Sequence, residues 1–122
     1  KRRAYIISKL EELNIKYRYF EMIELDELNE LYNCLDLYIV SSRIEGGPQA
    51  IFECAITKTN IISTDVGIAR EILSENSIFN MENFENAVPD IETAYTNVQK
   101  YTKNKGIERF NSLFYKIINE IQ

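Results

Sequence analysis

Two glutamates, Glu45 and Glu53, lie eight positions apart around a Gly-Gly-Pro turn. Of the patterns in the sequence, this one most strongly indicates a chemical function. A strand-like apolar run at residues 37–41 precedes the turn, and a helix-like run begins at Pro48. Proline is favoured at the first position of a helix because it has no N–H to leave unpaired. Such a corner directs backbone N–H groups and the positive end of the helix dipole at one place, which suits a phosphate or diphosphate.

The two acids lie at different depths of this corner. Glu45 is in the loop at its mouth, whereas Glu53 lies about a turn and a half into the helix. Beside an anion-binding corner, two such carboxylates could hold the hydroxyls of a nucleotide-sugar. The alternatives are a solvated loop acid at Glu45 and, at Glu53, a helix acid that caps the helix or pairs with a neighbouring base.

Small residues and free N–H groups surround the two acids. Gly46 and Gly47 would let the backbone approach a sugar and its phosphates closely, although a tight turn required by the fold alone also explains them. The first turn of the helix offers N–H groups to phosphate or ribose oxygens at Gln49, Ala50 and Ile51.

Basic residues are few near these loops. Arg43 and Arg70 are the nearest in sequence, and a surface ion pair fits them better than a phosphate contact. Outside residues 1–3 the sequence shows no large basic patch, and its formal net charge is −5, which argues against a nucleic-acid-binding module. No apolar run approaches the roughly 18 residues of a membrane span, and no apolar stretch follows the basic N-terminus as in a signal peptide.

The composition fits one soluble domain, with 122 residues of which 45% are hydrophobic and 27% charged. Cys34 and Cys54 are expected to be reduced core residues of a cytoplasmic protein. The absence of histidine excludes Ser-His and Cys-His catalysis and argues against a structural zinc site. Tyr32, Tyr38 and Phe52 are expected in the core.

Hydrophobic periodicity divides the chain into alternating helices and strands. Helices are predicted at residues 4–13, 26–32, 48–57, 67–73, 91–102 and 107–121. Strands are predicted at residues 17–23, 37–41, 60–64 and 77–79, with a polar loop and a helical turn at 80–90. This alternation is typical of an α/β protein with a doubly wound parallel sheet, whose ligands bind beyond the carboxyl ends of the strands. The apolar run at 37–41 predicts a strand covered on both faces.

The last predicted helix has an apolar face that is wide enough to require burial. Its members are Ile107, Phe110, Leu113, Phe114, Ile117, Ile118 and Ile121. In an isolated domain this face would be exposed and could promote self-association.

Three segments in order resemble a known family. Residues 27–42, ELNELYNCLDLYIVSS, look like the approach to the donor site in group 1 glycosyltransferases (glycosyltransferase family 4). Residues 45–53, EGGPQAIFE, are similar to the E-x7-E signature of that family, and residues 60–72, NIISTDVGIAREI, resemble the segment that follows it. The similarity runs from about residue 4 to residue 80.

The resemblance implies a GT-B architecture, in which two Rossmann-like domains face each other across the active site. Residues 1–122 would be a partial C-terminal, nucleotide-sugar-binding domain, with its C-terminal helices at residues 91–122. The N-terminal acceptor domain and the first βαβ portion, where the family usually carries an Arg and a Lys for the diphosphate, would be absent. The chain alone is therefore expected to be inactive.

The resemblance also implies a reaction, the retaining transfer of a hexosyl group to an acceptor hydroxyl in polysaccharide or glycolipid biosynthesis. Glu45 would be catalytic and contact the transferred sugar, and Glu53 would hold the ribose of the nucleotide. The other donor-binding residues would be Gly46, Gly47, Gln49, Ala50 and Ile51. No cofactor or metal is implied, since the UDP-, GDP- or ADP-sugar is the substrate.

Partners and location follow from the same resemblance. The acceptor would be a sugar or a lipid-linked sugar bound by the missing domain. The protein would be cytoplasmic, and at full length it could associate with the inner face of the membrane. Glu71 matches an acid of the third segment and is expected to be structural, or to support the site through a neighbouring residue, rather than to be catalytic.

Some residues depart from the family pattern and leave other functions open. Glu21 stands where glycine is usual beside the nucleotide base, and Lys58-Thr59-Asn60 replaces a usual Gly-x-Pro. One alternative is a non-catalytic module for interaction or regulation, with a Rossmann-like or flavodoxin-like fold. Another is a nucleotide-sugar epimerase of the same two-domain architecture.

Overall fold

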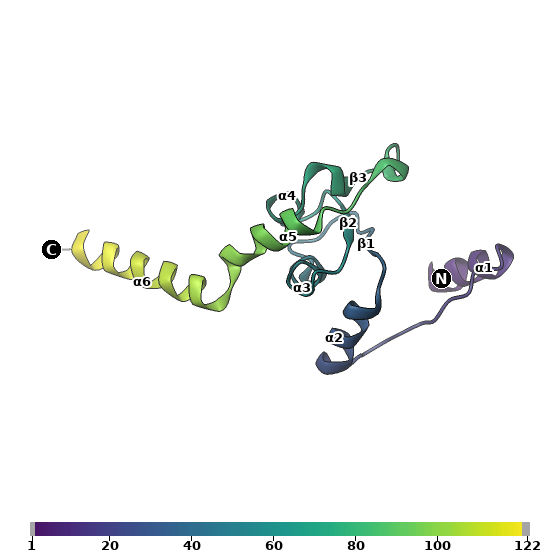
Figure 1. Ribbon diagram of the computed structural model, residues 1–122, viewed down its shortest axis with the longest axis horizontal. Helices are drawn as coiled ribbons and strands as arrows, with labels where there is room; N and C mark the ends of the chain where they lie inside the picture. The colour runs from purple at the N-terminus through teal and green to yellow at the C-terminus, as the bar shows by residue number, and fades with distance from the viewer. Residues whose placement is uncertain (1, 121–122) are drawn as a thin grey trace.

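The computed structural model describes residues 2–120. In chain order its elements are α1 (Arg2–Glu12), α2 (Leu25–Cys34), β1 (Tyr38–Val40), α3 (Gln49–Thr57), β2 (Ile61–Thr64), α4 (Ala69–Ile72), η1 (Glu75–Ser77), β3 (Ile78–Phe79), η2 (Phe84–Asn86), α5 (Ile91–Val98), η3 (Gln99–Tyr101) and α6 (Lys103–Glu120). Figure 1 shows a central body that runs from α2 to α5, with α1 and α6 at opposite ends of the molecule.

Three parallel strands form the sheet of this body, in the order β1-β2-β3. Tyr38 pairs with Ile61, and Ser63 pairs with Ile78. α3 contacts both β1 and β2, and the helices α3, α4 and α5 also contact one another. The core lies between these helices and the sheet. Its largest fully buried apolar side chains are Ile51, Ile61, Ile72, Val98 and Cys54.

The helices of the body begin and end for local reasons. The Asp90 carboxylate caps α5 by accepting hydrogen bonds from the hydroxyl (2.7 Å) and the N–H (3.0 Å) of Thr93, and these bonds lower the pKa of Asp90. α3 ends at Thr57 and is capped by Lys58, whose φ of 56° is left-handed and whose N–H donates to the carbonyl of Cys54. A left-handed residue after the last turn is a common helix stop, although glycine is the usual choice.

The sheet differs from the predicted one in two respects. Ile39, on the face opposite Val40, remains 53% exposed, so the prediction of a strand covered on both faces is wrong for β1. A doubly wound sheet also requires a reversal in strand order, whereas the order here follows the chain. The structure thus supports a parallel α/β domain but does not confirm double winding.

The strand predicted at residues 17–23 is wrong, because this segment forms no regular element. Met22 adopts a left-handed φ of 56°, which interrupts an extended run. Within the described residues, β1 pairs with β2 only, so no ladder extends to the aromatic segment. Without a neighbouring strand its β propensity has nothing to stabilise it.

The other predicted elements are confirmed, with small shifts at their ends. The predicted helix at 91–102 divides into α5 and the 3-10 turn η3, and the last helix begins at Lys103 rather than Ile107. Its predicted end at Ile121, like Lys1 of the basic N-terminal cluster, lies outside the described residues.

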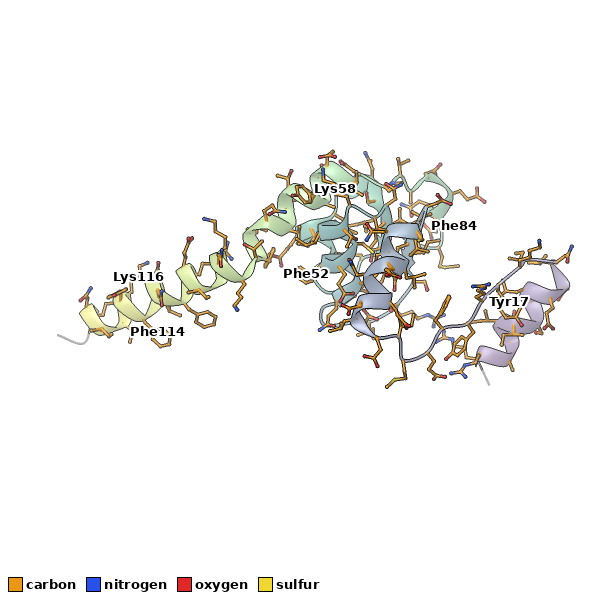
Figure 2. The ribbon with its side chains drawn as sticks, turned by 60° about the horizontal axis from the view of Figure 1, so that its bottom comes forward. Tyr17, Phe52, Lys58, Phe84, Phe114 and Lys116 are labelled. Atoms are coloured by element: carbon orange, nitrogen blue, oxygen red, sulfur yellow. The ribbon has the colours of Figure 1, made fainter. Side chains whose placement is uncertain are left out.

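The first and last helices, α1 and α6, contribute no buried residue. The apolar face of α6 is exposed, as expected for an isolated domain, and Figure 2 shows Phe114 far from the body while Phe52 lies within it. The side chains of this face that the structure describes are Ile107, Phe110, Leu113, Phe114, Ile117 and Ile118.

Candidate functional site

The turn between β1 and α3 forms the predicted corner. Pro48 is the cap residue of α3 rather than its first residue, and the helix begins at Gln49. The N–H of Ile51 already donates to the carbonyl of Pro48 (3.1 Å), so it is not free, contrary to the prediction. The Ile51 side chain is fully buried and anchors the helix start in the core. At the start of α3 the N–H groups of Gln49 and Ala50 have no acceptor within the helix.

Glu45 is exposed in the loop, and its neighbours tie it to the sheet. The Ser42 hydroxyl donates to Oε1 of Glu45 (2.6 Å). The Thr64 hydroxyl, at the end of β2, donates in turn to the carbonyl of Ser42 (2.6 Å). The position of the loop acid therefore depends on a hydroxyl of the neighbouring strand.

The loop after β2 also contacts the glycine pair directly. A Cβ on Gly67 would lie 2.9 Å from the N of Gly47 and 3.0 Å from the carbonyl of Gly46, and Gly67 has a left-handed φ of 50°. Any other residue at position 67 would push the two loops apart. Thr64 and Gly67 were not among the predicted site residues, although both lie in the family-like segment at residues 60–72.

Gly46 and Gly47 themselves are under no such constraint. A Cβ at either position would meet nothing within 4 Å, and neither residue has a positive φ. The fold therefore does not require glycine at these positions, and the tight-turn explanation loses its support. Open space over a peptide without side chains is what a closely bound ligand needs.

Glu53 is half-buried on α3 and is held by a residue of α2. The Tyr32 hydroxyl donates to Oε2 of Glu53 (2.7 Å), and burial together with this bond raises the pKa of Tyr32. The two residues line a cavity of about 300 Å³ between α2 and α3. The rest of its lining is mostly apolar and comprises Leu25, Leu28, Asn29, Phe52, Ile56 and Thr57.

Tyr38 connects the surroundings of the two acids. Its pKa is raised mainly by burial, with smaller contributions from Cys54, Glu53 and Glu45. Both carboxylates thus act on the pKa of one phenol. Glu53 lines the α2–α3 cavity, whereas Glu45 lies on the exposed loop.

A second cavity, of about 340 Å³, lies where the three strands end. Residues from all three strand ends line it, namely Ser41, Ser42, Arg43, Thr64, Asp65, Val66, Phe79, Asn80 and Met81. In parallel sheets this edge is the usual place for ligands. Arg43 is the basic residue in this lining.

The other polar residues near the corner have structural roles. Arg70 forms the predicted surface ion pair, with Asp65 (Nη2 to Oδ2, 2.8 Å). Glu71 accepts a hydrogen bond from the Tyr101 hydroxyl, which agrees with its predicted structural role.

The two cysteines differ. Cys54 is fully buried, and burial, with a smaller effect of the Glu53 carboxylate, raises the pKa of its thiol to about 12. Cys34 is exposed, so its predicted place in the core is wrong. Tyr32 is buried, and Tyr38 and Phe52 pack against the core as predicted.

Residues 2–120 contain neither a cluster typical of a metal site nor a helix able to cross a membrane. No three side chains of the His, Cys, Asp and Glu types lie together as a metal site would require. None of the helices in this range combines the length and apolarity needed to cross a bilayer.

Comparison with known proteins places these loops in a family. The sequence model of the family described as "Glycosyl transferases group 1" matches residues 1–109 of the chain. The match includes both glutamates, the glycine pair and the loop with Gly67. No curated protein sequence matches the chain significantly.

Proposed function

Because this chain belongs to the group 1 glycosyl transferases, we propose that it is the donor-binding part of a retaining enzyme, which transfers a sugar from a nucleotide-sugar to an acceptor hydroxyl. One observation carries the proposal. Gly46 and Gly47 lie just before α3, and a Cβ at either position would enter open space. The fold therefore does not require glycine at either position. Beside these glycines are two acids that the protein holds in place.

The donor would lie along α3. Its diphosphate faces the helix start, where the N–H groups of Gln49 and Ala50 and the helix dipole favour negative charge. Glu45, at the loop, contacts the transferred sugar, and Glu53, further along the helix, holds the ribose. Ile51 supports this arrangement from the core below.

The proposed chemistry is electrostatic. The Glu45 carboxylate favours the positive charge that develops at the anomeric carbon, and the helix start stabilises the leaving diphosphate. No metal or cofactor enters this scheme. Basic groups and an acceptor site on a second domain would complete it, so that this chain would bind the donor without transferring its sugar.

We extend the proposal to the family, the architecture and the pathway. It then includes membership of glycosyltransferase family 4, the C-terminal position in a GT-B architecture with a Rossmann-like doubly wound sheet, and a role in polysaccharide or glycolipid assembly. The donor would be a UDP-, GDP- or ADP-sugar, and the acceptor a sugar or lipid-linked sugar.

Titration of the chain with UDP, GDP and ADP, followed by amide NMR, tests the proposal. We expect shifts concentrated in residues 42–53 for at least one nucleotide. Glu53→Gln should weaken its binding about tenfold, because a hydrogen bond to a charged group is lost. Glu30→Gln, at an exposed acid of α2, is the matched control and should bind like the wild type.

Two results would contradict the proposal. One is the absence of a response to all three nucleotides, which the interaction module predicts. The other is a response confined to residues outside the corner and the α2–α3 cavity.

A further inference from the structure

Tyr32 is buried and held from several sides next to Glu53. It is only 4% exposed, and its ring lies 5.6 Å from that of Tyr38, centroid to centroid. The buried Thr59 hydroxyl donates to the backbone carbonyl of Tyr32 (2.9 Å) and fixes this turn of α2 against the end of α3. The Tyr32 hydroxyl can therefore occupy essentially one place.

That place determines the orientation of Glu53. Oε2 of Glu53 accepts the Tyr32 hydroxyl at 2.7 Å. No hydrogen bond to Oε1 is found within residues 2–120, and no buried side-chain oxygen in this range lacks a partner. Oε1 is therefore accessible to solvent, so one oxygen is bound by the protein and the other is available to a ligand.

We propose that Tyr32 is a positioning residue, which fixes Glu53 so that Oε1 meets a ribose hydroxyl and the site selects ribonucleotides over 2′-deoxyribonucleotides. The inference rests on the proposed function, since it takes Glu53 as the ribose-binding acid. A carboxylate held in place rejects an analogue that lacks the hydroxyl, because its accessible oxygen is then left without a partner. A carboxylate free to turn would find water instead and would discriminate less.

The chain contains a matched control for this contact. The Tyr101 hydroxyl also donates to a glutamate, Glu71, but the pair lies outside the proposed donor site. Tyr101→Phe removes the same hydroxyl from the same kind of bond. It leaves in place the ring that packs edge-on against Phe52.

The experiment compares UDP, GDP and ADP with their 2′-deoxy counterparts, as Kd values for the chain measured by NMR titration. For the nucleotide that binds, we expect the wild type and Tyr101→Phe to prefer the ribose form about tenfold. Tyr32→Phe should reduce this preference to about twofold by weakening the ribose form, and should leave the deoxy form unchanged. Combined with Glu53→Gln, Tyr32→Phe should change the preference no further.

The outcomes separate this inference from the proposed function. A wild type that binds none of the six nucleotides overturns both. Binding without a ribose preference overturns the role of Tyr32 and the assignment of Glu53 to the ribose, but not donor binding at the corner. A Tyr32→Phe variant that keeps the wild-type preference overturns only the role of Tyr32. If Tyr32→Phe does not fold, the wild type labelled with ¹³C at Cζ of tyrosine decides the question. The Tyr32 signal should then move with the ribose form and stay in place with the deoxy form, and equal movement overturns the inference.

Discussion

The two acids of the corner are held in opposite ways. Glu45 lies on an exposed loop, and its position depends on contacts made to the loop backbone, namely the hydrogen bond from the Thr64 hydroxyl to the Ser42 carbonyl and the close approach of Gly67 to the Gly46–Gly47 peptide. Glu53 is half-buried on a helix and depends on a single side chain, Tyr32. The loop acid should therefore tolerate the loss of the Ser42 hydroxyl that binds it, because Thr64 and Gly67 hold the loop backbone, whereas the helix acid should not tolerate the loss of the Tyr32 hydroxyl.

Gly67→Ala should have the largest effect on stability, and it acts on the loop that carries Glu45. The new Cβ would lie 2.9 Å from the backbone N of Gly47, at a residue with a left-handed φ. Overpacking and the left-handed conformation together should lower the free energy of unfolding by about 2–4 kcal/mol. Urea unfolding followed by circular dichroism measures it.

Gly106→Ala is the control for this change. Gly106 lies within α6, where a Cβ would meet nothing within 4 Å. Alanine there should leave the body unchanged and stabilise the helix by about 0.5–1 kcal/mol. Equal effects of the two substitutions would show that the contact between the two loops does not hold the Glu45 loop.

Alkaline pH should lower stability through the buried groups next to Glu53. The thiol of Cys54, beside Glu53, keeps its proton up to a pKa of about 12 in the folded chain, whereas its ordinary value is 9.0. The unfolded chain therefore loses this proton first, and stability falls as the pH rises above 9. Tyr32, whose pKa is also raised, acts in the same direction above pH 10. At pH 10 the thiol alone should lower the free energy of unfolding by about 1 kcal/mol.

Urea unfolding at pH 8, 9 and 10 measures this loss. Cys54→Ala should flatten the dependence on pH, whatever it does to stability at pH 8. Cys34→Ala, the same change at an exposed cysteine, is the control. A Cys54→Ala variant with the wild-type slope would argue against a buried thiol beside Glu53.

Much of the corner could be predicted because its determinants are local. The apolar run before the turn, the proline and the periodic apolar residues after it gave β1 and α3 nearly their observed bounds. Both acids lie where the pattern predicted, one exposed and one half-buried. These features depend on neighbours along the chain, and a single sequence records such neighbours well.

The rest depends on contacts between segments far apart in the sequence. Residues 17–23 have strand propensity but no neighbouring strand within the described residues, so they form none. Cys34 lies in an apolar sequence context, yet that side of α2 faces solvent. Thr64 and Gly67 contact loop residues that lie about twenty positions earlier in the sequence, and no local pattern encodes these contacts.

Ser42→Ala should have the smallest effect on stability. It tests directly whether the Ser42 side chain holds the loop that carries Glu45. The Ser42 hydroxyl donates to Oε1 of Glu45 at 2.6 Å, but both groups lie at the surface, where water replaces a lost bond. We expect the free energy of unfolding to change by less than about 1 kcal/mol. Ser112→Ala, which removes an exposed hydroxyl bonded to the Glu108 carbonyl in α6, is the control. Amide NMR should show unchanged shifts at Gly46 and Gly47, because Thr64 and Gly67 hold the loop backbone. Large shifts there would mean that the Ser42 side chain holds it, and the contrast between the two acids would disappear.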